Sequence, residues 1–417
     1  MLQFSDYINK SQKSKNNSNL LVIYAAGTIG KLTLNALKEK NIRVNYFCDY
    51  DSTKWNTEVE NIKVISPNDL YNLDKNTDIF VSYYVFDGYV PLLKNKGFKN
   101  LYSSASLLTE ASVDAFCKKN SKSHQKLKFI RLIEYYKEMS MKDDYIGDYI
   151  TNGKLNLKTI DIQVTEKCSL KCKDCNNLMQ YYEKPKDSDM DVLLKSIDRF
   201  MQCIDNLDEF RVLGGDPFMN KELYKVINKL VTYEKCKRVV VYTNAKILPK
   251  GENLNCLKNK KVVLDITNYG EICSAHLKLV ELAEKENIAF STVRCTEWLD
   301  SGRILPYSGK SEKELENLFN GCQQSDLISL LHGKLYRCPF SANGVNLKAI
   351  PQNDSDEVNL INDNFSINEL REQIKKLCFN KKYLTACSYC NGKDFSTLKI
   401  PSAIQTKKPL PYTINKK

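Results

Sequence analysis

Between residue 157 and about residue 300, strand-like and helix-like segments alternate, and this alternation constrains the fold more than any other feature of the sequence. Stretches at 192–203, 221–232 and 274–286 have the pattern of amphipathic helices. The strand-like segments that they separate are 157–165, 209–215, 238–244, 261–268 and 288–294. Such alternation predicts parallel strands in an open or closed barrel, with the chemistry at the carboxyl ends of the strands. We therefore expect an α/β fold.

Size and composition limit the class of protein. The chain has 417 residues, of which 42% are hydrophobic and 27% are charged, so two or three globular domains are expected. No charged-then-apolar leader opens it, and apolar runs such as 20–26 are far shorter than the roughly 20 residues of a membrane helix. The net charge of +12 comes without a dense Lys and Arg run that also carries aromatic residues. We therefore expect a cytoplasmic protein with no membrane span and no nucleic acid partner.

Three cysteines stand close together directly after the first predicted strand. Cys168, Cys172 and Cys175 have the spacing Cys-x3-Cys-x2-Cys. In a reducing compartment, clustered thiols are better explained as metal or cluster ligands than as disulfides. Three thiolates can hold three irons of a 4Fe–4S cluster and leave the fourth iron open. A structural zinc site, which is the alternative, needs a fourth Cys or His nearby, and residues 176–202 contain neither.

This loop after a first strand resembles the signature of the radical S-adenosylmethionine (SAM) enzymes, which share a partial (β/α)6 barrel. The resemblance implies that SAM binds the open iron through its amino and carboxylate groups. The reduced cluster would cleave SAM to methionine and a 5′-deoxyadenosyl radical, which takes a hydrogen atom from the substrate. The protein positions and shields this chemistry. A flavodoxin or ferredoxin would supply the electron.

Two further motifs at strand ends extend the resemblance. Residues 213–218 read Leu-Gly-Gly-Asp-Pro-Phe where the family usually has Gly-Gly-Glu-Pro, and 243–245 read Thr-Asn-Ala where Thr-Asn-Gly is common. Another departure is Asp174, since the family often has an aromatic residue beside the last cysteine. The residues that the resemblance assigns to SAM binding are Asp174, Gly214, Gly215, Asp216, Pro217, Thr243 and Asn244.

Four more cysteines form a second group in the C-terminal region. Cys322 and Cys338 enclose Gly333 as Cys-x10-Gly-x4-Cys, and Cys387 and Cys390 form Cys-x2-Cys. Four thiolates can fully ligate a second 4Fe–4S cluster, and a four-cysteine zinc knot is the alternative. The group resembles the twitch domain, the shorter relative of the SPASM domain, because no cysteine follows Cys390.

The N-terminal segment has the strand, glycine turn, helix and strand pattern of a nucleotide-binding unit. The turn reads Ala25-x-Gly27-x-x-Gly30, so the first glycine of a dinucleotide motif is missing, and Asp49 ends the second strand where an acid can bind a ribose. The segment resembles Rossmann-like domains of sugar-modifying and polysaccharide-biosynthesis proteins. A βαβ unit that binds nothing is the alternative.

These features predict five parts of the chain. They are a Rossmann-like domain at 1–115, a connecting helix at 116–152, a radical SAM core at 153–305, a twitch-like iron–sulfur domain at 306–398 and a mobile tail at 399–417. The apolar face of the connecting helix would consist of Phe129, Leu132, Ile133, Tyr136 and Met139.

The reaction is less constrained than the cofactors. In twitch-type dehydrogenases of aminocyclitol biosynthesis, which the ligand spacing resembles, the auxiliary cluster accepts the electron left when a substrate alcohol radical loses its proton. An epimerase would instead return a hydrogen atom from a thiol such as Cys256 or Cys295, and Tyr269 is the third catalytic candidate. Stretches 266–270 and 297–302 resemble radical SAM proteins encoded with glycan-assembly enzymes. Candidates for the substrate pocket, each with a core or capping role as the alternative, are Asp265, Asn268, Tyr269, Trp298 and Asp300.

The favoured hypothesis is a radical SAM enzyme that oxidises or epimerises a carbohydrate or nucleotide sugar in glycan or polysaccharide biosynthesis. A peptide-modifying maturase is an alternative, but such relatives often carry a winged-helix domain where this chain has a βαβ unit. A non-catalytic iron–sulfur sensor or scaffold is a further alternative, against which the complete cysteine loop and glycine motif count.

Overall fold

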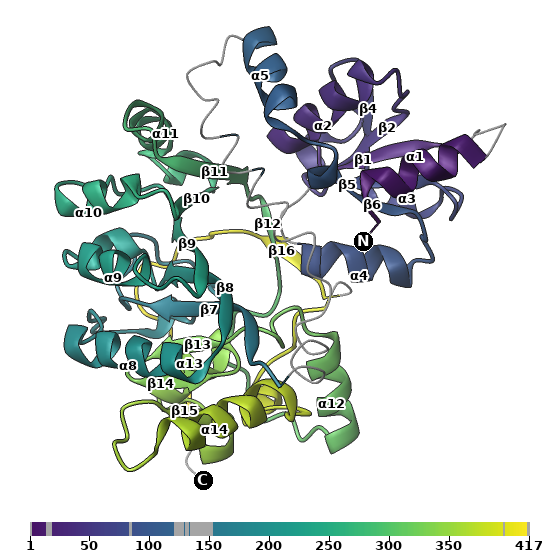
Figure 1. Cartoon of the computed structure of the whole chain (residues 1–417). Helices are drawn as coiled ribbons and strands as arrows, with labels where there is room; N and C mark the ends of the chain where they lie inside the picture. The colour runs from purple at the N-terminus through teal and green to yellow at the C-terminus, as the bar shows by residue number, and fades with distance from the viewer. Residues whose placement is uncertain are drawn as a thin grey trace. The chain divides into compact units, whose positions relative to one another are not determined.

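The computed structural model describes residues 2–13, 19–82, 86–120, 129, 133, 153–394 and 397–414 (Figure 1). The chain divides into two compact units, Met1–Asp143 and Asp144–Lys417. Of the predicted connecting helix, residues 116–119 belong to the helix α5, and most of the rest lies outside the described residues. Phe129 is described, and its ring meets that of Phe116 edge to face at 5.9 Å.

The first unit is built on a sheet with the strand order β3-β4-β2-β1-β5-β6. Its neighbouring strands run parallel except for β3, which is antiparallel to β4. The strands are β1 (Leu21–Tyr24), β2 (Tyr46–Cys48), β3 (Glu58–Val59), β4 (Ile62–Ile65), β5 (Asp78–Val81) and β6 (Leu101–Ser103). The helices are α1 (Phe4–Lys13), α2 (Thr28–Glu39), α3 (Pro67–Tyr71), α4 (Phe86–Asn95) and α5 (Glu110–Lys119). Without β3, the chain order across the sheet is 3-2-1-4-5, the arrangement of a doubly wound dinucleotide-binding sheet.

The second unit is built on a larger sheet with the order β11-β10-β9-β8-β7-β13-β14-β15. The strands β7 to β11 are parallel, as the alternating segments predicted. They are β7 (Asn156–Gln163), β8 (Asn206–Leu213), β9 (Cys236–Thr243), β10 (Val262–Asn268) and β11 (Ala289–Arg294). The helices between them are α8 (Met190–Cys203), α9 (Leu223–Leu230), α10 (Glu252–Asn255) and α11 (His276–Lys285). The expected α/β class with a partial barrel is confirmed.

The C-terminal cysteine region continues this sheet instead of forming a separate layer. Its strand β13 pairs in parallel with β7, with Ser329 opposite Asp161, so the sixth parallel strand lies beside the first and not beyond β11. The remaining strands are β12 (Glu297–Leu299), β13 (Ser329–Leu331), β14 (Lys334–Tyr336), β15 (Glu357–Asn359) and β16 (Lys399–Pro401). The remaining helices are α12 (Glu312–Gly321), α13 (Pro339–Asn346) and α14 (Ile367–Phe379). The expected boundary at 306 therefore lies inside one compact unit.

The outer face of the second sheet forms the main apolar core. Ile160, Phe210 and Val239, one on each of three neighbouring strands, are fully buried. They pack with side chains of α8, α9 and α14, among them Phe200 and Ile227. Because apolar and polar residues alternate along these strands, the opposite face of the sheet is free to carry polar groups.

The C-terminal tail differs from the expectation of mobility. The strand β16 pairs antiparallel with β12, and Figure 1 shows the two side by side. Further along, Leu410 N donates to Gln180 O at 2.8 Å, and Tyr412 Oη donates to Leu347 O at 3.0 Å. Lysines and prolines suggested an unanchored end, but backbone hydrogen bonds fix this segment, and such bonds have no local sequence signal. Among the described helices, none is long and apolar enough to cross a bilayer.

Candidate iron–sulfur sites and substrate pocket

The three cysteines predicted to hold a cluster lie on the loop that follows β7. Cys172 is buried, whereas Cys168 and Cys175 are half-buried. All three pack in one small apolar cluster with Tyr269 and Trp298, whose rings meet edge to face at 5.5 Å. The structure therefore places both predicted pocket aromatic residues beside the cysteine loop.

The sulfur atoms of this loop suit a group that carries positive charge. Burial raises the pKa of Cys168 and Cys175, and burial with the neighbouring Cys175 raises the pKa of Cys172 to about 12. Thiolates are therefore unfavourable here unless cations such as iron compensate them. Leu170 N lies 3.5 Å and Asn244 Nδ2 lies 3.6 Å from Cys168 Sγ. Three soft donors with hydrogen bonds to sulfur fit a 4Fe–4S cluster that has one open iron.

The glycine motif after β8 lets two loops meet backbone to backbone. A Cβ at Gly214 would lie 2.2 Å from the carbonyl oxygen of Thr165, and one at Gly215 would lie 2.2 Å from that of Lys167. Gly215 N donates to Thr165 O at 3.0 Å, and Asp216 N donates to Lys167 O at 2.9 Å. The motif therefore holds the base of the cysteine loop, a role that its sequence spacing did not reveal.

Asp216 joins the ends of β8 and β9. One oxygen of its buried carboxylate accepts hydrogen bonds from Thr243 Oγ1 at 2.9 Å and from Asn244 N at 3.1 Å. The other oxygen accepts from Phe218 N at 3.1 Å, and Pro217 begins the short helix that follows. Burial raises the pKa of Asp216, although these hydrogen bonds act in the opposite direction. The predicted SAM-binding residues of both motifs thus form one network.

Asp174 is held by an ion pair. Its Oδ1 lies 2.6 Å from Nε of Arg303, which also reaches Asp300 Oδ1 at 3.2 Å. The neighbouring Gly302 leaves no room for a side chain, because a Cβ there would lie 1.9 Å from Asp174 O. The segment after β12 therefore packs against the end of the cysteine loop and holds it through the ion pair. The sequence analysis named Asp300 but missed Arg303, which no local motif marks.

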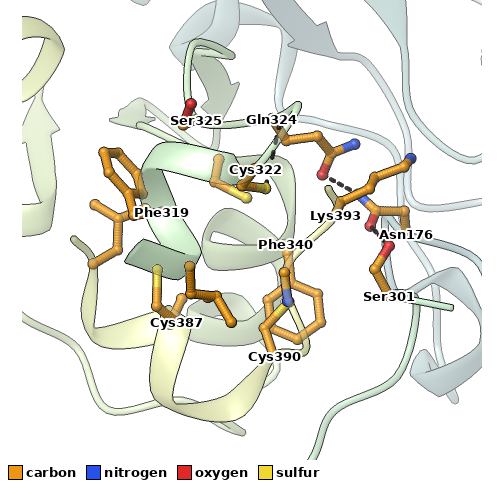
Figure 2. A pocket seen from close by; sticks show the side chains of 15 residues that line it. Asn176, Ser301, Phe319, Cys322, Gln324, Ser325, Phe340, Cys387, Cys390 and Lys393 are labelled. Carbon is orange, nitrogen blue, oxygen red and sulfur yellow. Dashed lines mark hydrogen bonds between the residues drawn. The ribbon is translucent and has the colours of Figure 1, made fainter. Parts of the chain in front are cut away.

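The four C-terminal cysteines line one cavity (Figure 2). Cys322 directly follows α12 and Cys338 directly precedes α13, whereas Cys387 lies in the short helix Thr385–Tyr389 and Cys390 directly follows it. Burial first, and the neighbouring thiols after it, raise the pKa of Cys338, Cys387 and Cys390 to about 12. The gathering of four buried or half-buried cysteines from distant parts of the chain fits a second, fully ligated cluster.

Among the residues that the structure describes, no group of three or more His, Cys, Asp or Glu side chains is placed to hold one metal ion. A zinc ion draws its ligand atoms to within about 2.0–2.3 Å, whereas a four-iron cluster spreads its cysteines over separate irons.

A chain of hydrogen bonds joins the two cysteine sets. Asn176, the residue after Cys175, donates from Nδ2 to Gln324 Oε1 at 2.6 Å (Figure 2). Gln324 N in turn lies 3.5 Å from Cys322 Sγ. Ser301 Oγ donates to Asn176 Oδ1 at 3.3 Å and steadies this link. The two sites are therefore neighbours, although 147 positions separate Cys175 from Cys322 in the sequence.

Lys393 places a cation at the edge of the same cavity. Its side chain lines the cavity with the four cysteines, and Figure 2 shows it running beside Asn176. Burial lowers the pKa of Lys393, while the nearby thiols of Cys322 and Cys295 act in the opposite direction. A residue between the two cysteine sets thus carries a group that can bind an anion. Sequence reasoning missed it because no local motif distinguishes it from the other lysines of the chain.

The three catalytic candidates have different surroundings. Cys256 is buried in the main apolar core, and its thiol donates to Asn253 O at 3.4 Å. Tyr269 packs against the cysteine loop. Cys295 follows β11, and its Sγ lies 3.5 Å from Glu297 O. The structure therefore brings Tyr269 and Cys295 toward the predicted SAM site but places Cys256 within the core.

The inner face of the second sheet carries a polar layer that the sequence analysis largely missed. Arg211 Nε lies 3.3 Å from Oδ1 of the buried Asp161, its partner on the next strand. The guanidinium of Arg211 also stacks at 4.9 Å over the ring of Tyr242, which is paired with Asp265. Parallel strands covered on both faces are normally apolar throughout. Polar residues at alternate positions, such as Asp161 and Gln163 on β7 and Glu209 and Arg211 on β8, are the signal that could have revealed this polar layer.

The two other pocket candidates have local partners. Asn268 Oδ1 accepts from Gly270 N at 2.8 Å and from Arg294 Nη1 at 3.3 Å. Asp300 pairs with Arg303, as described above. Both residues therefore shape the rim of the sheet around the cysteine loop.

In the first unit, the expected ribose-binding acid has internal partners. Asp49 accepts hydrogen bonds from Ala26 N at 2.8 Å and Asp51 N at 2.8 Å, and it pairs with Lys54 Nζ at 3.0 Å. Ala25 takes the place of the first motif glycine and has a φ of 85°, a backbone region that glycine adopts more easily. The turn after β1 thus has the backbone shape of a dinucleotide fold. The carboxylate of Asp49, however, bonds to groups of the neighbouring loops.

A family model described as a 4Fe–4S single cluster domain matches residues 162–280, which contain the cysteine loop and both strand-end motifs. The expectation of an iron–sulfur domain here is confirmed. GTP 3′,8-cyclase from Aquifex aeolicus (strain VF5) is 24% identical over 150 residues, which is 32% of this chain and 47% of that protein. The chain therefore aligns with about half the length of this curated relative.

Two solved structures are similar to the chain. BtrN in complex with AdoMet and 2-DOIA is 16% identical, with a TM-score of 0.37, and the match covers 61% of this chain and 97% of that one. Native anSMEcpe with bound AdoMet and Cp18Cys peptide is 15% identical, with a TM-score of 0.38, and covers 58% and 92%. No substrate follows for this chain from similarities of this size.

Proposed function

We propose that this chain is a radical SAM enzyme that holds a 4Fe–4S cluster and SAM and oxidises an alcohol group of a small carbohydrate-like substrate; the match of residues 162–280 to a 4Fe–4S single cluster domain supports the cluster. The substrate would bind at the inner face of the second sheet, between the cysteine loop and the cavity of the four C-terminal cysteines. A nucleotide-linked sugar is the favoured substrate class, and a flavodoxin or ferredoxin is the favoured electron donor.

The oxidation of an alcohol requires the removal of a hydrogen atom, an electron and a proton, and different residues would serve each. Cys168, Cys172 and Cys175 would hold the cluster that binds SAM, and these cofactors would supply the radical chemistry that removes a hydrogen atom from the substrate. The four C-terminal cysteines would hold a cluster that could accept the remaining electron. The substrate hydroxyl must also lose a proton. Asp161 and Asp265 on the inner face can orient hydroxyl groups by hydrogen bonding and accept that proton. One hydrogen atom, one proton and one electron then account for the oxidation of an alcohol to a carbonyl.

The observation that carries the proposal is the link between the two cysteine sets. The hydrogen bond from Asn176 to Gln324 ties the SAM-cluster loop to the cavity of the second set. Four cysteines around that cavity leave no iron open for a substrate, so an electron-accepting role suits this cluster better than substrate binding does. Neighbouring cofactors favour oxidation, in which an electron must leave the substrate.

Two further observations favour a sugar carrying phosphate. Hydroxyl-rich ligands need paired donors and acceptors, and the layer of Asp161, Arg211 and Tyr242 provides them. Lys393 adds a cation at the cavity edge that can bind a phosphate or carboxylate. Epimerisation is less well supported, because Cys256 lies in the apolar core and Cys295 is the remaining thiol near the site.

The test is an anaerobic assay of reconstituted protein with candidate nucleotide sugars deuterated at single carbons. The expected result is deuterium in 5′-deoxyadenosine and a product two mass units lighter than the undeuterated substrate. Deuterium transfer with a product that has the mass of the undeuterated substrate would replace oxidation by epimerisation. Reaction with peptides and with no sugar would overturn the substrate class. Absence of 5′-deoxyadenosine under every condition would instead support an iron–sulfur scaffold.

A further inference from the structure

The C-terminal segment forms a cover over the predicted SAM-cluster loop. Lys173 N donates to Ile404 O at 2.7 Å, and Thr406 N donates to Lys171 O at 2.7 Å. Between these bonds Gln405 stands opposite Cys172 in a short antiparallel bridge. Ala403 is buried against Leu170 and Cys172 in the apolar cluster of the loop. Residues 403–406, here called the cover segment, thus pair with the cysteine loop through antiparallel backbone hydrogen bonds.

The side chain of Gln405 presents a donor to a cluster sulfur. Its Nε2 lies 3.2 Å from Cys172 Sγ and 2.7 Å from Ala403 O. Its Oε1 accepts from Lys171 N at 2.7 Å. A backbone N–H can only donate and a carbonyl can only accept, so these two partners fix the amide orientation. The N–H of Gln405 must therefore face the sulfur.

We propose that Gln405 is a positioning residue of the SAM-binding cluster, whose amide N–H stabilises the reduced cluster through Cys172. This rests on the assignment of Cys168, Cys172 and Cys175 as the cluster ligands. Reduction adds negative charge that the ligand sulfurs share, and a hydrogen bond to sulfur stabilises that charge. The contact raises the reduction potential of this cluster and makes electron transfer into it easier. The bond of Gln405 to Lys171 N also holds one face of the loop in place.

The decisive measurement compares the full-length reconstituted protein with Gln405→Leu and Gln405→Glu. Gln405 is largely exposed, so neither change opens a cavity. Redox titration followed by electron paramagnetic resonance should show a more negative midpoint potential in both variants. The relevant signal is the one that changes when SAM is added, because only the cluster with an open iron binds SAM. Gln405→Glu keeps the acceptor for Lys171 N and loses the donor, so it separates the sulfur contact from loop anchoring.

Ile404→Ala is the matched control, because its side chain is exposed and its backbone bond to Lys173 remains. This variant should keep the wild-type potential. In the wild type, electron–nuclear double resonance should detect an exchangeable proton coupled to the reduced cluster that Gln405→Leu lacks. Wild-type iron content with an unchanged potential and proton coupling in Gln405→Leu would overturn the proposal. If no cluster signal of the reconstituted wild type changed when SAM was added, the assignment of Cys168, Cys172 and Cys175 as ligands of a SAM-binding cluster would instead be overturned.

Discussion

At the scale of single residues, Asp216 shows how a departure from a family pattern can be built into a site. Its shorter side chain sits entirely within a network that ties β8 to β9, accepting from the hydroxyl of Thr243 and from the N–H groups of Asn244 and Phe218. Because the carboxylate is fully buried, each of these donors would have no water to turn to if the acceptor were removed. The residue therefore stabilises the loop ends as much as it serves a cofactor.

Asp216→Ala should destabilise the protein by about 3 kcal/mol, because three buried donors lose their acceptor. It should also weaken SAM binding, since the same residues end the strands around the cysteine loop. Asp216→Asn keeps the volume and a carbonyl oxygen, and it should cost about 1 kcal/mol. Urea unfolding and equilibrium dialysis of SAM measure the two effects. Equal stability of the alanine variant and the wild type would contradict this account.

At the scale of elements, close backbone contacts around the cysteine loop matter more than the loop's own sequence. The motif glycines after β8 approach it from one side, and Gly302 after β12 approaches it from another. In each case a Cβ would collide with a carbonyl oxygen of the loop. The segments after β8 and after β12 thus pack so closely on the cysteine loop that these positions have no room for a Cβ atom.

Gly302→Ala should displace the end of the cysteine loop and lower the iron bound per chain, because the new Cβ would lie 1.9 Å from Asp174 O. The expected loss is from about 8 irons toward about 4, since the C-terminal cysteines keep their own cluster. The matched control is Gly27→Ala, where a Cβ meets nothing within 4 Å. Iron and sulfide analysis after anaerobic reconstitution decides the question. A Gly302→Ala protein with full iron content would show that the loop can shift without loss of the cluster.

The four C-terminal cysteines should be separable from SAM cleavage. The double change Cys387→Ala and Cys390→Ala should also leave about 4 irons, but these would belong to the SAM-binding cluster. Formation of 5′-deoxyadenosine should persist, whereas substrate oxidation should fall at least tenfold because the electron acceptor is missing. Cys117→Ala, which changes a buried cysteine of the first unit, is the control and should leave both activities unchanged. Retention of substrate oxidation in the double variant would argue against an electron-accepting role.

At the scale of the whole molecule, the features that could be predicted from the sequence are those that depend on the order of neighbouring strands and loops along the chain. The cysteine loop and the glycine motif follow strands whose alternation is visible in the chain, so parallel pairing brings Cys168 and Gly215 together. The sequence did not predict the contacts of Arg303 with Asp174 or of Gln405 with Cys172, because these join segments 129 and 233 positions apart. Nor did it predict that the C-terminal cysteine region extends the same sheet, since a strand of three residues such as β13 has no periodicity to recognise.

This organisation predicts which part of the chain carries the cofactors. Both cysteine sets, the strand-end motifs and the cover segment lie within Asp144–Lys417, and the described residues of the main apolar core of that unit all belong to the same unit. A chain that begins at residue 144 should therefore fold and bind about 8 irons after reconstitution. It should cleave SAM when reduced, because every residue assigned to that step is present. Iron analysis and chromatography of 5′-deoxyadenosine provide the measurement, with the full-length chain as the control.

If the shortened chain bound no more than about 4 irons, the first unit would be needed to complete one of the two sites. If it kept both clusters and lost only substrate turnover, the first unit would be the part that recognises the substrate.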